Sequence, residues 1–161
     1  MAHFQSQELP ALLYLDDLRV GWRFTSGSHT IDQDQILAFA RQFDPQPFHL
    51  DPAAARHSLF GGLVASGWHT AAVSMRLLVE SLPIAGGLVG AGGEIHWPAP
   101  TRPGAVVHIE GEIIELKPSR SRPDRGMVTV RSETRNEQDE VLQLFIAKLV
   151  VPRRPGAVGA T

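Results

Sequence analysis

Apolar and polar residues alternate through much of the second half of the chain. The alternation is clearest over residues 107–113 and again over residues 128–135. A period of two places successive side chains on opposite faces of a strand, so both segments are predicted to be strands. Residues 141–151 are almost continuously apolar, which is typical of a strand at the centre of a sheet. Residues 88–97, which are rich in glycine, and residues 21–30 are two further predicted strands.

The first half of the chain shows a helical period instead. One apolar stripe, spaced i, i+3, i+4 and i+7, consists of Ile36, Phe39, Ala40 and Phe43. Asp32 can cap this helix, and prolines at 45 and 47 require that it end near Phe43. Residues 44–49 are therefore predicted to form a rigid loop, and a short helical turn can start at Asp51.

A longer helix is predicted from about Ser66 to Leu82. Ser66 is a plausible N-cap, and a proline and two glycines follow Leu82. Apolar residues cover more than one face of this helix, so we expect it to be buried nearly all round. One strand, then helices, then four strands predict an α+β domain in which one buried helix packs against one antiparallel sheet.

The length of 161 residues fits one domain, which we place at residues 1–152. Residues 1–11 are expected to form a loose arm. Residues 153–161 are small, polar and interrupted by proline and glycine, and are expected to be a disordered tail. No stretch approaches the ~20 apolar residues that span a membrane, and the first residues do not resemble a secretory signal. We therefore expect a cytoplasmic protein with no membrane partner.

Composition removes several kinds of chemistry. The chain has no cysteine, which excludes disulfides, thiolate zinc sites and cysteine nucleophiles. A formal charge of −2 argues against nucleic acid as a partner. The histidines and carboxylates show no convincing metal-ligand spacing, so we expect no metal.

Asp44 and His49 are the first candidate site, because both lie in the segment stiffened by proline. A carboxylate and an imidazole can divide base and acid duties on one substrate if the loop presets their geometry. Taken alone, the pair is also explained by a loop in which Asp44 caps backbone amides and His49 packs at the loop's end.

Ser66 and Gly67 at the start of the longer helix are the second candidate. The first amides of a helix have no partner within it and carry partial positive charge. Gly67 has no side chain, so a ligand oxygen can approach its amide closely. An ordinary helix start capped by Ser66 is the alternative.

The two segments together resemble the MaoC-like dehydratases, hot-dog proteins that include the R-specific enoyl-CoA hydratases. The resemblance rests on DPQPFHLD at 44–51 and FGGLVASG at 60–67, within a match over roughly residues 16–152. It implies a hot-dog fold, with an antiparallel sheet wrapped around a central helix. It also implies that Asp44 and His49 are the catalytic pair, and that the Gly67 amide binds the thioester carbonyl.

The same resemblance implies an acyl-CoA substrate and a homodimer or higher homo-oligomer, with the thioester near the interface. No redox cofactor is implied, since hydration changes no oxidation state. The chain departs from the hydratases where they usually have asparagine, which is Gln46 here, and where some carry a helix serine, which falls at Met75. Trp68 is a large residue near the expected pocket mouth, and with Ser66 it completes the expected substrate-binding set.

We therefore predict an acyl dehydratase or enoyl-CoA hydratase, a hydro-lyase acting across the 2,3 double bond of an acyl-CoA. Two alternatives remain. A hot-dog acyl-CoA thioesterase would direct water at C1 rather than C3. A non-catalytic acyl-CoA-binding subunit would need neither Asp44 nor His49.

Overall fold

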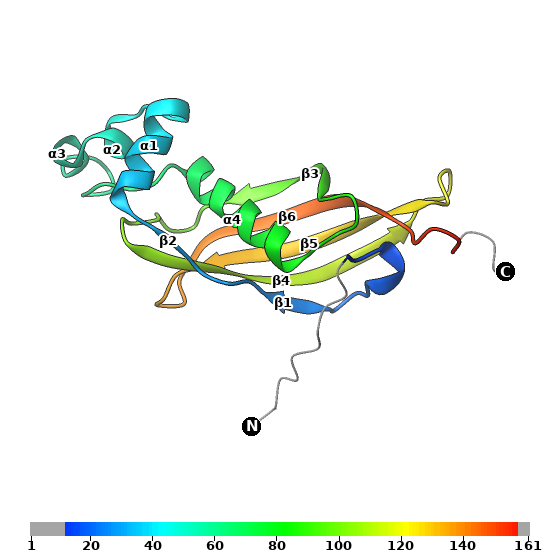
Figure 1. Ribbon diagram of the computed structural model, residues 1–161. Helices are drawn as coiled ribbons and strands as arrows, with labels where there is room; N and C mark the ends of the chain where they lie inside the picture. Colours follow the sequence, from blue (N-terminus) through cyan, green and yellow to red (C-terminus); the bar gives the residue numbers. More distant parts are fainter. Residues whose placement is uncertain (1–11, 158–161) are drawn as a thin grey trace, which may run out of the picture.

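An antiparallel sheet forms the larger layer of the protein (Figure 1). The computed structural model describes residues 12–157, so the expected arm at 1–11 and residues 158–161 lie outside the described residues. The strands follow the order β1-β4-β5-β6-β3, and β2 pairs with another part of β4. Their bounds are β1 Arg23–Thr25, β2 His29–Ile31, β3 Val89–His96, β4 Ala105–Pro118, β5 Arg125–Arg135 and β6 Val141–Pro152.

The alternation in the sequence correctly predicted the faces of the long strands. In β4, Val107, Ile109 and Ile113 are buried, whereas Glu110 is exposed. The apolar β6 is paired on both sides, as expected, and β3 lies at an edge of the sheet. The single strand predicted at 21–30 is wrong, because β1 and β2 pair with β4 as two short strands. Ser26 separates them, and its side-chain Oγ accepts a hydrogen bond from the Ile109 amide at 2.8 Å.

Tight turns connect β4, β5 and β6 in sequence. The β5–β6 turn is organised by Asn136, whose Oδ1 accepts hydrogen bonds from the Gln138 and Glu140 amides. Asp139 in this turn has a φ of 64°, a left-handed conformation that aspartate tolerates better than most residues. The turn therefore has a side-chain scaffold of its own.

Within the described residues, four helices occupy the positions that the sequence predicted, with two corrections, and a short 3₁₀ turn near residue 16 was not predicted. They are the 3₁₀ turn η1 Leu15–Asp17 and the helices α1 Gln33–Phe43, α2 Pro47–Leu50, α3 Pro52–Ala55 and α4 Gly67–Ser81. Asp32 caps α1 by accepting a hydrogen bond from the Gln35 amide. The predicted loop at 44–49 contains the start of α2, because Pro47 occupies the first helical position that suits its fixed φ. Phe43, expected in the buried stripe of α1, is 69% exposed.

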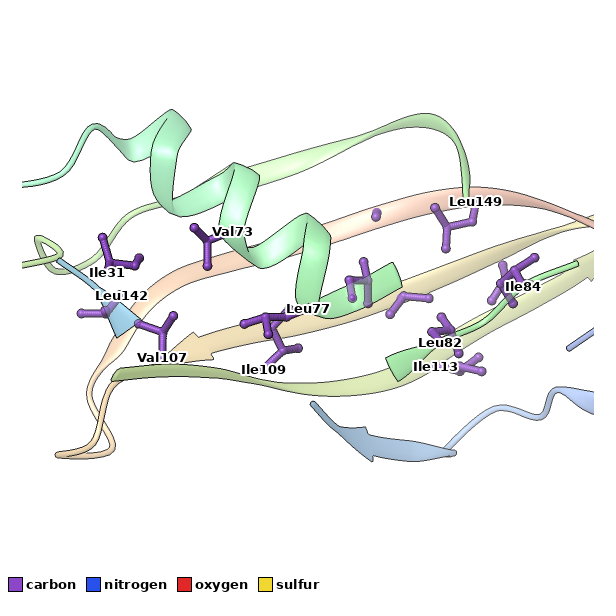
Figure 2. Close-up of a cluster of buried hydrophobic side chains, with 14 of the residues drawn as sticks. Ile31, Val73, Leu77, Leu82, Ile84, Val107, Ile109, Ile113, Leu142 and Leu149 are labelled. Carbon is purple, nitrogen blue, oxygen red and sulfur yellow. The ribbon is translucent and has the colours of Figure 1, made fainter. Parts of the chain in front are cut away.

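The long helix α4 lies across one face of the sheet, and α1–α3 gather at the end where α4 begins (Figure 1). Figure 2 shows Val73 and Leu77 of α4 directed toward Val107 and Ile109 of β4. The prediction that α4 is buried nearly all round is wrong for its opposite side. That side exposes an apolar row spaced i, i+4, i+7 and i+11, which consists of Trp68, Ala72, Met75 and Val79.

The ordered chain continues past the boundary expected at residue 152. The Arg153 amide donates to the Asp124 carbonyl, and the Arg154 amide donates to Asp16. The Arg154 guanidinium also pairs with Asp17. These contacts fix the first residues of the segment that was expected to be disordered.

Candidate active site

Asp44 and His49 lie together because one short segment leads from α1 into α2. Asp44 is the C-cap of α1, and its amide donates to the Ala40 carbonyl. His49 is in the single turn of α2, which begins three residues after Asp44. The Asp44 Oδ2 and His49 Nε2 atoms are 3.4 Å apart, and the two side chains are only 17% and 7% exposed.

The backbone fixes which ring nitrogen of His49 faces Asp44. The Nδ1 atom lies 2.7 Å from the Val64 carbonyl oxygen, which can only accept a hydrogen bond. Nδ1 therefore carries a hydrogen, and Nε2 is the nitrogen directed at Asp44. The Phe48 ring packs edge to face with the imidazole and further restricts its orientation. His49 can thus receive or release a proton at Nε2 without changing its contact with Val64.

Two donors hold the Asp44 carboxylate. Ser66 Oγ donates to Oδ2 at 2.6 Å, and Gln46 Nε2 donates to Oδ1 at 2.7 Å. Burial raises the pKa of Asp44, but these hydrogen bonds and the nearby His49 outweigh burial, so the pKa lies below its ordinary value of 3.8. Asp44 is therefore a carboxylate at neutral pH. The longer side chain of Gln46, noted as a departure from the hydratases, still reaches it.

The start of α4 completes this end of the site. Ser66 is the N-cap, as predicted, and its Oγ accepts a hydrogen bond from the Trp68 amide while it donates to Asp44. Gly67 is the first helical residue, and its amide has no hydrogen-bond acceptor among the described residues. One serine thus joins the carboxylate to a helix end whose first amide is unpaired.

These residues surround a cavity of about 430 Å³. Asp44, His49, Gly67 and Trp68 line it, and Ser66 lies behind Asp44. The structure therefore brings together all the site residues that the sequence predicted. The cavity is also lined by Phe48, by Phe60 and by the segment from Trp97 to Thr101.

Sequence reasoning missed the part of the cavity contributed by the segment between β3 and β4. Trp97 follows β3, and its indole N–H donates to Oε1 of the buried Gln143 at 3.0 Å. Thr70 and Thr101 are both buried, with their hydroxyl oxygens 2.8 Å apart. A glutamine inside the apolar run 141–151 was the one available signal, because a buried amide requires a partner.

The remaining histidine and arginine side chains differ in where they lie relative to the cavity. His69 is packed, with its ring stacked on Phe39 at 4.8 Å between centroids. Arg102 lies beside the cavity and donates to the carbonyl of Phe60. Three further arginines lie in or next to the β4–β5 turn, at the end of the sheet away from α1–α3 (Figure 1): Arg120, Arg122 and Arg125.

Among residues 12–157, no three histidine, aspartate or glutamate side chains gather in a way that could hold a metal ion. None of the helices in this described range is long and apolar enough to cross a membrane.

Comparison with known proteins places the chain in a family. Residues 23–136 match the model of the MaoC like domain. The chain belongs to the MaoC-like dehydratase family. The crystal structure of a MaoC-like dehydratase from Rhodospirillum rubrum is 59% identical to it, with a TM-score of 0.87 over 89% of this chain and 99% of that one. The α+β hot-dog fold expected from the sequence is thereby confirmed.

Two further proteins are similar in sequence to this MaoC-like protein. The uncharacterized protein YdeM of Bacillus subtilis is 31% identical over 140 residues, which are 85% of this chain and 96% of YdeM. A 3-hydroxybutyryl-CoA dehydratase of Methylorubrum extorquens is 33% identical over 117 residues, which are 71% of this chain and 73% of that enzyme. The match to the family model covers the whole segment from Asp44 to Gly67.

Proposed function

We propose that this MaoC-like protein is a hydro-lyase that adds water to, or removes it from, the 2,3 double bond of an acyl-CoA thioester. The observation that carries the proposal is the arrangement of Asp44, His49 and the unpaired Gly67 amide around one cavity. It provides two proton-transfer groups and a donor for a developing oxyanion, which are the groups that this reaction requires. The named activity of the Methylorubrum relative supports the same reaction class.

In the hydration direction, Asp44 Oδ2 takes a proton from the attacking water while the water oxygen bonds to C3. The electron pair of the double bond moves toward the thioester, and the Gly67 amide donates a hydrogen bond to the resulting enolate oxygen. His49, protonated at Nε2, then gives its proton to C2. A proton passes from Asp44 to His49 across their 3.4 Å separation and restores the starting state. Dehydration follows these steps in reverse.

Neither an electron nor a group other than water is transferred, so this mechanism needs no cofactor beyond the CoA of the substrate. Trp68 and Ser66 have supporting roles in the proposal. Trp68 flanks the thioester at the mouth of the cavity, and Ser66 keeps Asp44 ionised and directed at the water.

The test is incubation of the purified protein with trans-2-enoyl-CoA thioesters. The expected result is loss of the enoyl absorbance and a mass gain of one water, with no free thiol. Release of thiol without hydration would instead identify a thioesterase. Tight binding of the thioester without any product would identify a non-catalytic acyl-CoA-binding subunit.

We also propose that the protein acts as a homodimer. The apolar row on α4 defined above is exposed in the single chain, and it lies on the helix whose first turn lines the cavity. The exposed strand β3 lies at the edge of the sheet. A second copy that covers both features would bury the apolar row and pair a free strand edge.

A further inference from the structure

Two side-chain contacts hold the Trp97 ring, although Trp97 lies just after the edge strand β3. Its indole N–H is bonded to Gln143, which is 1% exposed and lies on the helix-facing side of β6. Removing the indole would leave the buried Gln143 Oε1 without this partner. The ring also meets Trp68 edge to face, with centroids 5.2 Å apart. The indole is therefore fixed in one orientation beside the cavity.

The missing side chain of Gly67, at the start of α4, leaves room for this ring. A Cβ atom on Gly67 would lie 2.7 Å from Trp97 Cε2 and 2.8 Å from Cδ2, which is closer than real Cβ contacts. Gly67 is thus required by the indole that packs on it, as well as by any ligand that approaches its amide. Trp97 consequently occupies space directly beside the proposed carbonyl site.

Along α4, the cavity ends at a buried threonine. This residue, Thr70, is 1% exposed and shares a hydroxyl contact with Thr101. One turn further along α4, Ser74 donates to the Thr70 carbonyl and pairs with Thr134 of β5. These buried hydroxyls fill the layer between helix and sheet, so an acyl tail has no open path along it.

We infer that Trp97, fixed by Gln143, is the residue that limits acyl-chain length, and that the protein takes thioesters of short acyl groups. The inference rests on the proposed function. An acyl chain that extends from a carbonyl at Gly67 meets the indole on one side and the Thr70–Thr101 hydroxyl pair at its end. Each methylene that does not fit a closed pocket lowers kcat/KM by about 10- to 200-fold.

The test measures kcat/KM for trans-2-enoyl-CoA substrates of four, six, eight and ten carbons. For the wild-type protein, we expect the eight-carbon substrate to be at least about tenfold poorer than the four-carbon one. Trp97→Leu is expected to raise the eight-to-four-carbon ratio by about tenfold or more. Gln143→Leu, which keeps the ring but removes its anchor, should move the ratio in the same direction by less.

Trp22→Leu is the matched control, since it makes the same change at a tryptophan that packs against the core and does not line the cavity. It should leave the chain-length ratio within about twofold of wild type. Equal activity on all lengths in the wild type, or an unchanged ratio in folded Trp97→Leu, would overturn the inference. If Trp97→Leu does not fold, Trp97→Phe and Gln143→Leu decide in the same way.

A failure of the proposed function gives a different result. If no enoyl-CoA of any length is hydrated, the hydro-lyase proposal is wrong. The limit that Trp97 sets on acyl-chain length is then tested by calorimetric binding of saturated acyl-CoAs of the same lengths. Weaker binding of the eight-carbon than the four-carbon thioester would support the role of Trp97. Equal or tighter binding would refute it.

Discussion

At Asp44, each carboxylate oxygen accepts one hydrogen bond, from Ser66 and Gln46 respectively, and Oδ2 also faces His49. Asp44→Asn retains the volume but provides only one oxygen, so one of the two donors loses its acceptor. The variant cannot take a proton from water. We expect hydration to fall by about 10²–10⁴-fold, the usual share of a general base, with a folded protein in a thermal melt.

His49→Ala is expected to cause a loss of similar size, because the addition needs both groups: Asp44 takes a proton from the water, and His49 gives a proton to C2 and then receives the proton held by Asp44. The double variant should be little worse than either single variant, since groups that work as one unit are not additive. Losses that simply multiply would contradict the mechanism. Asp51→Asn is the control, because asparagine also caps helices well and can retain the role of Asp51 at the start of α3.

His69 gives a pH dependence of stability that is separate from catalysis. Burial, assisted by His29 and opposed by Asp32, lowers the pKa of His69 below its ordinary value of 6.5. The unfolded chain therefore binds this proton more tightly than the folded one. The stabilising effect is complete above about pH 6.5 and is lost as the pH falls from there through the folded pKa.

We expect the Tm of the wild type to decrease between pH 7 and pH 5, and His69→Phe to decrease less over the same range. Phenylalanine keeps a ring against Phe39 and removes the buried Nδ1, which has no hydrogen-bond partner within residues 12–157. His57→Phe serves as the control, because His57 is exposed in the folded protein. Parallel Tm curves for wild type and His69→Phe would refute the prediction.

At the scale of elements, the start of α4 and the end of β3 depend on one pair of residues. Gly67→Ala places a Cβ against the Trp97 ring, so we expect a lower Tm and a loss of kcat/KM. Trp97→Leu removes most of the obstructing ring. Gly67→Ala should therefore cost much less, in both Tm and kcat/KM, in the Trp97→Leu background than in the wild type.

A double-mutant cycle over the four proteins measures this coupling. Equal losses in both backgrounds would mean that the glycine is required by the substrate and not by Trp97.

The elements were more accessible to sequence reasoning than the contacts between them. Periodicity predicted α1, α4 and the long strands, because it reports which side of an element is buried. It did not predict the exposed side of α4, because an apolar residue on that side gives the same sequence pattern whether it is covered by its own chain or by a partner. Asp44, His49 and Gly67 were found through their spacing and a family resemblance. Trp97 and Gln143 are 46 residues apart, and nothing in either segment identifies the other.

At the scale of the whole molecule, the apolar row on α4 is the feature that a single chain leaves uncovered. If a second copy covers it, Val79→Glu or Met75→Glu places a charge in that contact and should yield a monomer in light scattering at micromolar concentration. Arg76→Glu changes charge on the same helix next to the row and is the control. A wild-type protein that is a stable, active monomer would refute the dimer.

The tight turns between β4, β5 and β6 have a kinetic consequence. Strands joined by short turns pair early, because closing a small loop costs little entropy, whereas the Trp97–Gln143 contact must wait for distant segments to meet. We therefore expect Asn136→Ala, which dismantles the β5–β6 turn, mainly to slow refolding. Gln143→Leu should instead mainly speed unfolding, because we expect its bond to form after the transition state. Stopped-flow chevron plots distinguish the two effects. If both are observed, the sheet forms in the folding chain before the pocket does.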